Sequence, residues 1–245
     1  MSDVILAVED LTVSFDGFKA VDGLNFYLEE NELRCVIGPN GAGKTTLLDM
    51  ICGKTKPSAG RIRFGNHQLT GMMEYQITRI GVGRKFQTPS TYEDLTVFEN
   101  LEISYPKPRS VRGCLFFRQT PAMLDRIGQI AEEISLQDEL HTKAGLLSHG
   151  QKQWLEIGML LMQEPTLLLL DEPVAGMSAR ERELTAELLK RISDGRTIVV
   201  IEHDMAFVRL IAHRVSVLHQ GKLIAEGTMD VVQNDERVIE VYLGH

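Results

Sequence analysis

The sequence predicts an α/β fold with a parallel core sheet, a preceding antiparallel sheet and an inserted helical segment. Three observations support this prediction. Residues 33–37 read as a short buried strand that leads into a glycine-rich loop and then a helical pattern. The runs 166–171 and 196–201 have the length and apolar composition of strands buried on both faces, and acidic residues stand at their ends. Residues 95–163 show mostly helical periodicity.

Short β-rich runs bounded by turn residues precede the helical segment. They lie at residues 5–8, 11–15, 24–28, 60–65 and 81–87. Over residues 4–37 such runs alternate with turns, which favours an antiparallel sheet that comes before the parallel core.

Helices are expected within the segment that follows, and a further helix and a hairpin after it. The three helical patterns are residues 95–103, 122–134 and 148–162. Ser148 is a suitable N-cap for the third. Residues 105–120 contain two prolines and are expected to be irregular and exposed. A capping box at 178–181 predicts another helix from Ser178, and residues 215–225 read as a β-hairpin.

Residues 38–45, Gly-Pro-Asn-Gly-Ala-Gly-Lys-Thr, match the pattern Gly-x-x-x-x-Gly-Lys-Ser/Thr. The glycines allow a tight backbone that aims several N–H groups at one anion. Lys44 can place its ammonium against the β- and γ-phosphates, and the Thr45 hydroxyl can bind Mg²⁺. The helix that follows would turn the positive end of its dipole to the phosphates. The predicted nucleotide-binding residues are Asn40, Gly41, Ala42, Gly43, Lys44, Thr45 and Thr46.

The composition excludes several other classes of protein. A chain of 245 residues with 43% hydrophobic content can bury a full core, and its net charge of −8 argues against broad binding to nucleic acid or anionic lipid. Cys35, Cys52 and Cys114 have no metal-ligand spacing and fit no disulfide framework, so a reducing cytoplasm is expected. The N-terminus lacks a signal-peptide pattern, and no run is apolar enough to span a membrane. Attachment to a membrane would therefore require a partner rather than direct lipid insertion.

Two adjacent acids follow the apolar run 166–170 and suit phosphoryl-transfer chemistry. Ligands bind at the carboxyl end of the strands in an open α/β sheet, and a carboxylate there can bind Mg²⁺. Asp171 occupies that position, and Glu172 beside it can accept a proton from an attacking water. We assign this chemistry to the two acids because a phosphate loop precedes them in the same chain.

Five segments together carry a resemblance to a known family. Residues 147–151, Leu-Ser-His-Gly-Gln, resemble the signature Leu-Ser-Gly-Gly-Gln of ATP-binding-cassette (ABC) ATPases. Gln87 stands where that family has its Q-loop glutamine, and His203 where it has its switch histidine. Asp171-Glu172-Pro173 resembles the end of the Walker B segment, and Phe15 stands where an aromatic side chain stacks on adenine. By their order and spacing over essentially the whole chain, the protein is identified as a member of the ABC ATPases.

The resemblance implies a P-loop NTPase (ABC ATPase) core with an antiparallel β-subdomain and an inserted α-helical subdomain. The core and β-subdomain would comprise residues 1–87 and 164–245, and the helical subdomain with the signature would comprise 88–163.

In this family two cassettes enclose two ATP molecules head to tail, and the resemblance assigns the residues accordingly. Mg²⁺ would be held by Thr45, Gln87 and Asp171. Hydrolysis would use Lys44, Gln87, Glu172 and His203. The second cassette would complete each site with Ser148, Gly150 and Gln151. The resemblance also implies membrane-spanning permease subunits, an identical or different second cassette and, indirectly, a solute-binding protein, at the cytoplasmic face of a bacterial inner membrane.

Two positions depart from the family pattern. His149 replaces the usual glycine of the signature and adds bulk near a phosphate; we expect its side chain to face outward rather than contact nucleotide. Ser178 stands where the D-loop often has an aspartate, and it can still cap the following helix. The missing carboxylate bears on communication across the dimer rather than on hydrolysis.

The C-terminal residues 226–244 resemble cassettes that serve importers of branched-chain amino acids, amides and urea. Residues 147–159 and 173–178 look most like the ATP-binding subunit of urea importers, which implies an importer of urea or short-chain amides. A branched-chain amino acid cassette and a lipopolysaccharide-export-type cassette are the alternatives. A cassette acting on ribosomes or DNA fits poorly, because the chain has one cassette, no heptads and a net negative charge. A P-loop GTPase fits poorly because no Asn-Lys-x-Asp motif occurs.

Overall fold

The computed structural model describes residues 3–85, 90–106 and 119–243, and the contacts group the chain into two compact units. Unit 1 comprises residues 1–84, 166–173 and 193–245, and unit 2 comprises residues 85–165 and 174–192. The expected helical subdomain, 88–163, falls within unit 2, which also takes in residues 174–192.

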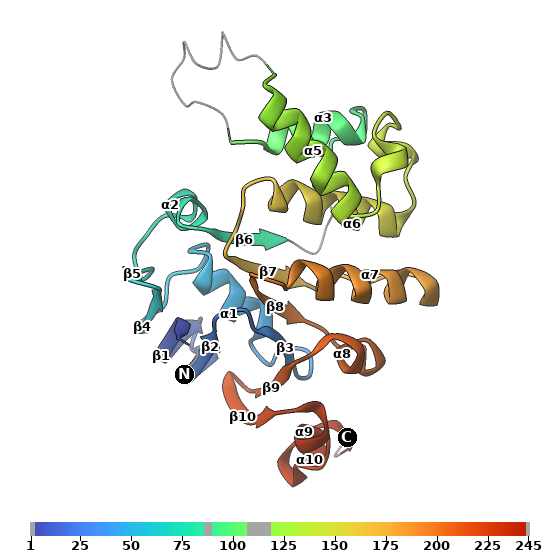
Figure 1. Ribbon diagram of the computed structural model, residues 1–245. Coiled ribbons are helices and arrows are strands. Elements are labelled where there is room, and N and C mark those ends of the chain that lie inside the picture. The colour runs from blue at the N-terminus through green and yellow to red at the C-terminus, as the bar shows by residue number, and fades with distance from the viewer. Residues whose placement is uncertain (1–2, 86–89, 107–118, 244–245) are drawn as a thin grey trace. The chain divides into compact units, whose positions relative to one another are not determined.

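The first sheet of unit 1 is antiparallel, as the sequence predicts (Figure 1). Its order is β2-β1-β4-β5, with β1 Val4–Phe15, β2 Phe18–Glu29, β4 Ala59–Phe64 and β5 His67–Gln68. The two runs expected at 5–8 and 11–15 are one strand, which is a correction. The strand continues through Asp10 because this residue adopts φ 48° and its N–H donates to Asn25 Oδ1 at 3.1 Å on the paired strand.

The second sheet of unit 1 forms the core and has the order β10-β9-β3-β8-β7-β6. Its strands are β3 Leu33–Ile37, β6 Val82–Lys85, β7 Leu167–Asp171, β8 Thr197–Ile201, β9 Arg214–His219 and β10 Lys222–Gly227. β3 pairs in parallel with β8 and β9, and β7 pairs in parallel with β8. Every residue of β3, β7 and β8 is buried, including Arg34 of β3, whose guanidinium pairs with Glu32 and Glu226. The hairpin β9–β10 is antiparallel, as expected.

Five helices are described in unit 1, and the sequence patterns predicted only the first. They are α1 Lys44–Ile51, α2 Glu74–Arg79, α8 Met205–Ile211, α9 Met229–Gln233 and α10 Glu236–Leu243. The other four have eight residues or fewer, too few turns for a clear 3.6-residue period. α1 is as short, and the glycine-rich loop before it is what predicts it. α8 begins where Asp204 Oδ1 accepts from Ala206 N and Phe207 N, and α9 and α10 both contact β10.

Unit 2 contains the helices that the sequence predicts. They are α3 Val97–Ser104, α5 Pro121–Glu133, α6 His149–Leu161 and α7 Ala179–Ile192, with short 3₁₀ turns at Gln137–Glu139 and Ala144–Leu146. Trp154 on α6 donates to the Thr185 hydroxyl on α7 at 2.8 Å, which fixes these two helices together. Residues 107–118 of the segment expected to be irregular lie outside the described residues. Within the described ranges, no helix combines the length and apolar character needed to cross a bilayer.

Candidate nucleotide-binding site

The phosphate loop connects the buried strand β3 to helix α1, in the predicted order. Gly43 is the N-cap of α1 and has φ 98°, a left-handed conformation that favours glycine. A Cβ at Gly43 would lie 2.4 Å from the carbonyl oxygen of Ala20 on β2. A Cβ at Gly38 would lie 2.1 Å from the carbonyl oxygen of Leu218 on β9. The glycines therefore allow the loop to pack closely against two neighbouring strands.

Lys44 is buried and turns back onto its own loop. Its Nζ donates to Gly38 O at 2.7 Å and to Pro39 O at 3.0 Å. Burial lowers the pKa of Lys44, whereas the carboxylates of Glu172 and Asp171 act to raise it. The ammonium thus lies in the loop that the motif assigns to phosphate, close to both acids.

Asp171 ends β7 with its side chain buried beside the phosphate loop. The Thr45 side chain lies close enough to this carboxylate to lower its pKa. Burial raises the pKa of Asp171, the contacts from Thr45 and Arg84 lower it, and Glu172 and Asp49 act in the same direction as burial. Asp171 Oδ1 is buried and has no hydrogen-bond partner among the described residues.

The oxygen groups of Thr45 and Asp171 fit a magnesium ion. Mg²⁺ prefers oxygen ligands and is usually bound by one or two carboxylates together with substrate phosphates. The unpartnered Oδ1 of Asp171 and the adjacent hydroxyl of Thr45 supply groups of this kind next to the phosphate loop. Among the described residues, no group of three or more His, Cys, Asp and Glu side chains forms a metal site made by the protein alone.

Arg84, on β6, is a residue of this site that the sequence patterns do not identify. Its Nη1 lies 2.5 Å from Asp49 Oδ1 and 3.1 Å from Cys52 Sγ, both on or next to α1. Its Nη2 lies 3.8 Å from Asp171 Oδ2. The nearly buried guanidinium therefore joins the phosphate-loop helix to the Asp171 carboxylate. An arginine within a predicted strand was the only available sequence signal.

Glu172 and His203 meet where β7 and β8 end. Glu172 Oε1 lies 3.4 Å from His203 Nδ1. The Glu172 backbone adopts φ 48° and its N–H donates to Ile201 O at 3.0 Å, so the chain turns sharply after Asp171. The His203 side chain is 66% exposed, and its backbone N–H donates to Glu202 Oε2 at 3.1 Å. The two predicted catalytic groups are thus adjacent and open to solvent.

Of the two remaining predicted residues, Phe15 lies within the described part of the chain and Gln87 does not. Phe15 pairs with Phe18 at the tip of the β1–β2 hairpin, and about half of its side chain is exposed. The same hairpin contacts the phosphate loop through Ala20 and Gly43. Phe15 is therefore available for stacking and is not a core residue. Gln87 lies outside the described residues.

The signature segment belongs to unit 2. Ser148 is the N-cap of α6 and its hydroxyl accepts from Gln151 N at 3.2 Å, while Gln151 Oε1 accepts from Ser148 N at 2.9 Å. Gly150 is buried in the first turn. His149 is exposed, and its Nε2 lies 3.0 Å from the carbonyl oxygen of Ala175. The capping box explains why the segment 148–151 begins a helix here.

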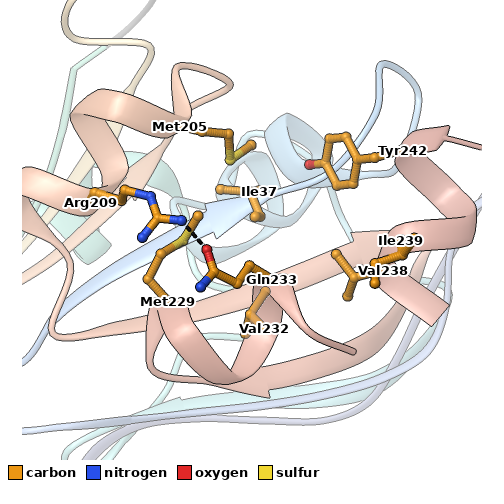
Figure 2. A pocket seen from close by; sticks show the side chains of 9 residues that line it. All are labelled: Ile37, Met205, Arg209, Met229, Val232, Gln233, Val238, Ile239 and Tyr242. Carbon is orange, nitrogen blue, oxygen red and sulfur yellow. Dashed lines mark hydrogen bonds between the residues drawn. The ribbon is translucent and has the colours of Figure 1, made fainter. Parts of the chain in front are cut away.

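A cavity of about 340 Å³ lies beside the phosphate loop in unit 1 (Figure 2). Ile37, Met205 and Met229 are among its mostly apolar lining residues, and Arg209 at its edge contacts Gln233. Tyr242 of α10 also lines it and makes a hydrogen bond with the Gly38 backbone; burial raises the pKa of this phenol. The C-terminal helix therefore contacts the first residue of the phosphate loop, and most of the side chains that line the cavity are apolar.

Two family models match parts of this chain. The model described as "ABC transporter" matches residues 21–175, which include the phosphate loop, the signature and both acids. The model described as "Branched-chain amino acid ATP-binding cassette transporter" matches residues 222–245, which include α9 and α10.

Individual relatives match over the full chain. BraF of Pseudomonas aeruginosa, a high-affinity branched-chain amino acid transport ATP-binding protein, is 34% identical to this chain. The alignment covers 100% of this chain and 99% of BraF. LivG of Escherichia coli, described in the same words, is 36% identical with the same coverage.

Solved structures agree with the observed fold. An ATP-binding cassette of an ABC transporter in its ADP conformation superposes with a TM-score of 0.88 at 31% identity, over 100% of both chains. A dimeric cassette in a post-hydrolysis state, bound to ADP and phosphate, superposes with a TM-score of 0.74 at 25% identity, over 91% of this chain and 98% of that one. The predicted fold class is confirmed, and the chain belongs to the ABC transporter family as an ATP-binding cassette of the branched-chain amino acid transporter type.

Proposed function

We propose that this cassette hydrolyses ATP to power an importer of branched-chain amino acids. One observation carries the catalytic part of the proposal: Lys44, Asp171, Glu172 and His203 lie together around the phosphate loop. The match of residues 222–245 to the branched-chain amino acid cassette model supports the choice of solute.

The chemistry follows from the positions of these groups. The N–H groups of the phosphate loop and the Lys44 ammonium would bind the β- and γ-phosphates. The Glu172 carboxylate would accept a proton from water while the water oxygen attacks the γ-phosphorus and the bond to the ADP oxygen breaks. His203, adjacent to Glu172, would orient the carboxylate and the γ-phosphate. Bound Mg²⁺ would neutralise charge on the phosphate oxygens.

A second cassette would complete each nucleotide site. Ser148 and Gly150 at the start of α6 offer a hydroxyl and an N–H group at a helix N-terminus, where an anion is stabilised. In the dimer these groups, with Gln151 in the same capping turn, would bind the γ-phosphate held by the other cassette. ATP would then close the dimer, and loss of the γ-phosphate would open it. The dimeric cassette with ADP and phosphate among the similar structures supports this arrangement.

The relatives favour branched-chain amino acids over urea or short-chain amides. BraF and LivG both match the whole chain and both are branched-chain amino acid cassettes by name. The C-terminal family model has the same description. These comparisons do not support the resemblance of residues 147–159 and 173–178 to urea cassettes. A branched-chain amino acid cassette, given above as an alternative, therefore fits better.

The partners would be two membrane-spanning permease subunits and, through them, a solute-binding protein. The cassette would lie at the cytoplasmic face of the inner membrane, held there by the permeases. The helical unit 2, including the Gln87 region, would transmit closure of the dimer to these subunits.

Two measurements test the proposal. A tagged cassette purified from its native membrane should bring down two permeases, and mass spectrometry would show whether a second, different cassette is present. Uptake of labelled leucine and of labelled urea is then compared between cells with the wild-type gene and cells with Lys44→Ala. Loss of leucine uptake alone supports the proposal, and loss of urea uptake alone overturns the choice of solute. Recovery of ribosomal or DNA-repair proteins without a membrane subunit would overturn the transport function.

A further inference from the structure

Glu181, in the first turn of α7, connects two loops of unit 2. Its Oε2 accepts from Ser178 N at 2.9 Å and from Ser178 Oγ at 2.8 Å. Its Oε1 accepts from Ser148 Oγ at 3.1 Å and lies against the backbone of Gly150, which lowers the pKa of this carboxyl. One carboxylate therefore joins the loop before α7 to the signature at the start of α6.

Only half of these contacts are explained by capping. A capping box needs the acidic side chain to bind the N-cap residue, and Glu181 Oε2 does this with Ser178. Oε1 lies instead against another helix. A Cβ at Gly150 would be 2.5 Å from Oε1, so the glycine of the signature is what lets the carboxylate approach the backbone.

The carboxylate is charged in this position. The N–H and hydroxyl of Ser178 lower the pKa of Glu181, Ser148 and Gly150 lower it further, and burial opposes them. An ionised carboxylate on the N-terminal donors of α6 is favoured by the helix dipole, as a phosphate would be. Two anions cannot share these donors, because a single hydroxyl proton serves one acceptor and like charges at contact distance repel.

We propose that Glu181 opposes ATP-driven pairing of cassettes by holding the Ser148 and Gly150 donors that would bind the γ-phosphate of a partner's ATP. This inference rests on the proposed function, in which the signature binds that phosphate. Closure requires Oε1 to leave Ser148 and Gly150. Oε2 can remain on Ser178, so the helix cap is kept while the signature donors become available. Glu181 thereby sets the nucleotide concentration at which the dimer closes.

The test uses the Glu172→Gln protein, in which slow hydrolysis would preserve the ATP-bound dimer. Into it we would introduce Glu181→Gln, which keeps a residue compatible with the capping box and removes the charge. Glu183→Gln is the matched control, because Glu183 lies on the same helix, is exposed and pairs with Arg180 rather than with the signature. Sedimentation velocity with saturating ATP and Mg²⁺ gives the dimer dissociation constant, and thermal melts confirm that all three proteins are folded.

We expect Glu181→Gln to lower the dimer dissociation constant about tenfold or more, and Glu183→Gln to leave it within about twofold. The inference is overturned if the two substitutions act equally, or if both doubly substituted proteins bind ATP and stay monomeric. ATP binding is measured separately by calorimetry. If the Glu172→Gln protein binds no ATP, the proposed function and this inference both fail; if it binds ATP and Glu181→Gln has no effect, only the inference fails.

Discussion

Glu172 Oε1 lies 3.4 Å from His203 Nδ1, and the two residues follow neighbouring parallel strands. Parallel pairing in register brings the ends of β7 and β8 to the same edge of the sheet, so the acid and the histidine meet although 30 residues separate them in the chain. The φ of 48° at Glu172 turns its side chain out of the strand direction. The positions of both side chains therefore depend on the sheet.

Replacing Glu172 with glutamine should nearly abolish ATP hydrolysis and leave ATP binding intact. The amide keeps the size of the side chain and cannot accept the proton from water, and a positioned base contributes roughly 10²–10⁴-fold. Phosphate release is the measurement, with nucleotide binding measured by calorimetry. Glu187→Gln, on the exposed side of α7, is the control. Turnover close to wild type would remove Glu172 as the base.

Replacing Lys44 with alanine should weaken ATP binding. The variant lacks the ammonium and therefore its charged hydrogen bonds to the phosphates. Each such bond contributes about 2 kcal/mol, or roughly thirtyfold in the dissociation constant. Calorimetry in the presence and absence of Mg²⁺ measures the change. Lys56→Ala, at an exposed position after α1, should bind ATP like the wild type. Equal affinities of the Lys44 and Lys56 variants would contradict the phosphate-loop assignment.

Replacing Asp171 with asparagine should stabilise the nucleotide-free protein in a chelator. Burial raises the pKa of Asp171, so this carboxyl holds its proton more tightly in the folded state than in the unfolded state. The folded protein therefore loses stability as the pH rises through the folded-state pKa and the side chain ionises. Asparagine removes this cost. We expect the melting temperature of the variant to be higher by a few degrees near neutral pH. A change of about 1 kcal/mol in the free energy of unfolding shifts the melting temperature of a domain of this size by that amount.

The pH dependence of the Asp171 effect is the check. The difference between Asp171→Asn and the wild type should shrink as the pH falls and the carboxyl becomes protonated. A variant that melts below the wild type near neutral pH would mean that Thr45 and Arg84 more than offset burial. The same variant should lose the Mg²⁺ dependence of ATP binding.

Replacing Phe15 with alanine should weaken ATP binding modestly. One aromatic stacking contact contributes about 1 kcal/mol, which corresponds to roughly fivefold in the dissociation constant. Phe18→Ala is the matched control, because Phe18 is its cross-strand neighbour on the same hairpin and is also exposed. If the Phe15 variant binds ATP as tightly as the Phe18 variant does, the stacking role is wrong.

Short, local features of the sequence predicted much of the fold and of the phosphate site. The order of β3, the phosphate loop and α1 depends on residues adjacent in the chain, and glycine is demanded where φ is positive at Gly43. Ser148 as an N-cap likewise predicted the start of α6, and its contact with Gln151 involves a residue only three positions away. Helices α2, α8, α9 and α10 have eight residues or fewer and little period to detect, and no phosphate-loop motif precedes them as it does α1.

The sequence by itself determined which groups this protein has for the proposed phosphate binding and water activation, because those motifs depend on fixed local spacing. Only the tertiary structure decided that Arg84 lies 3.8 Å from Asp171 and that Glu181 holds Ser148. These pairs are far apart in the chain, and their contacts depend on strand order and on how α6 packs against α7. A linear pattern does not encode such distances, because they arise only when buried faces and sheet register bring the segments together.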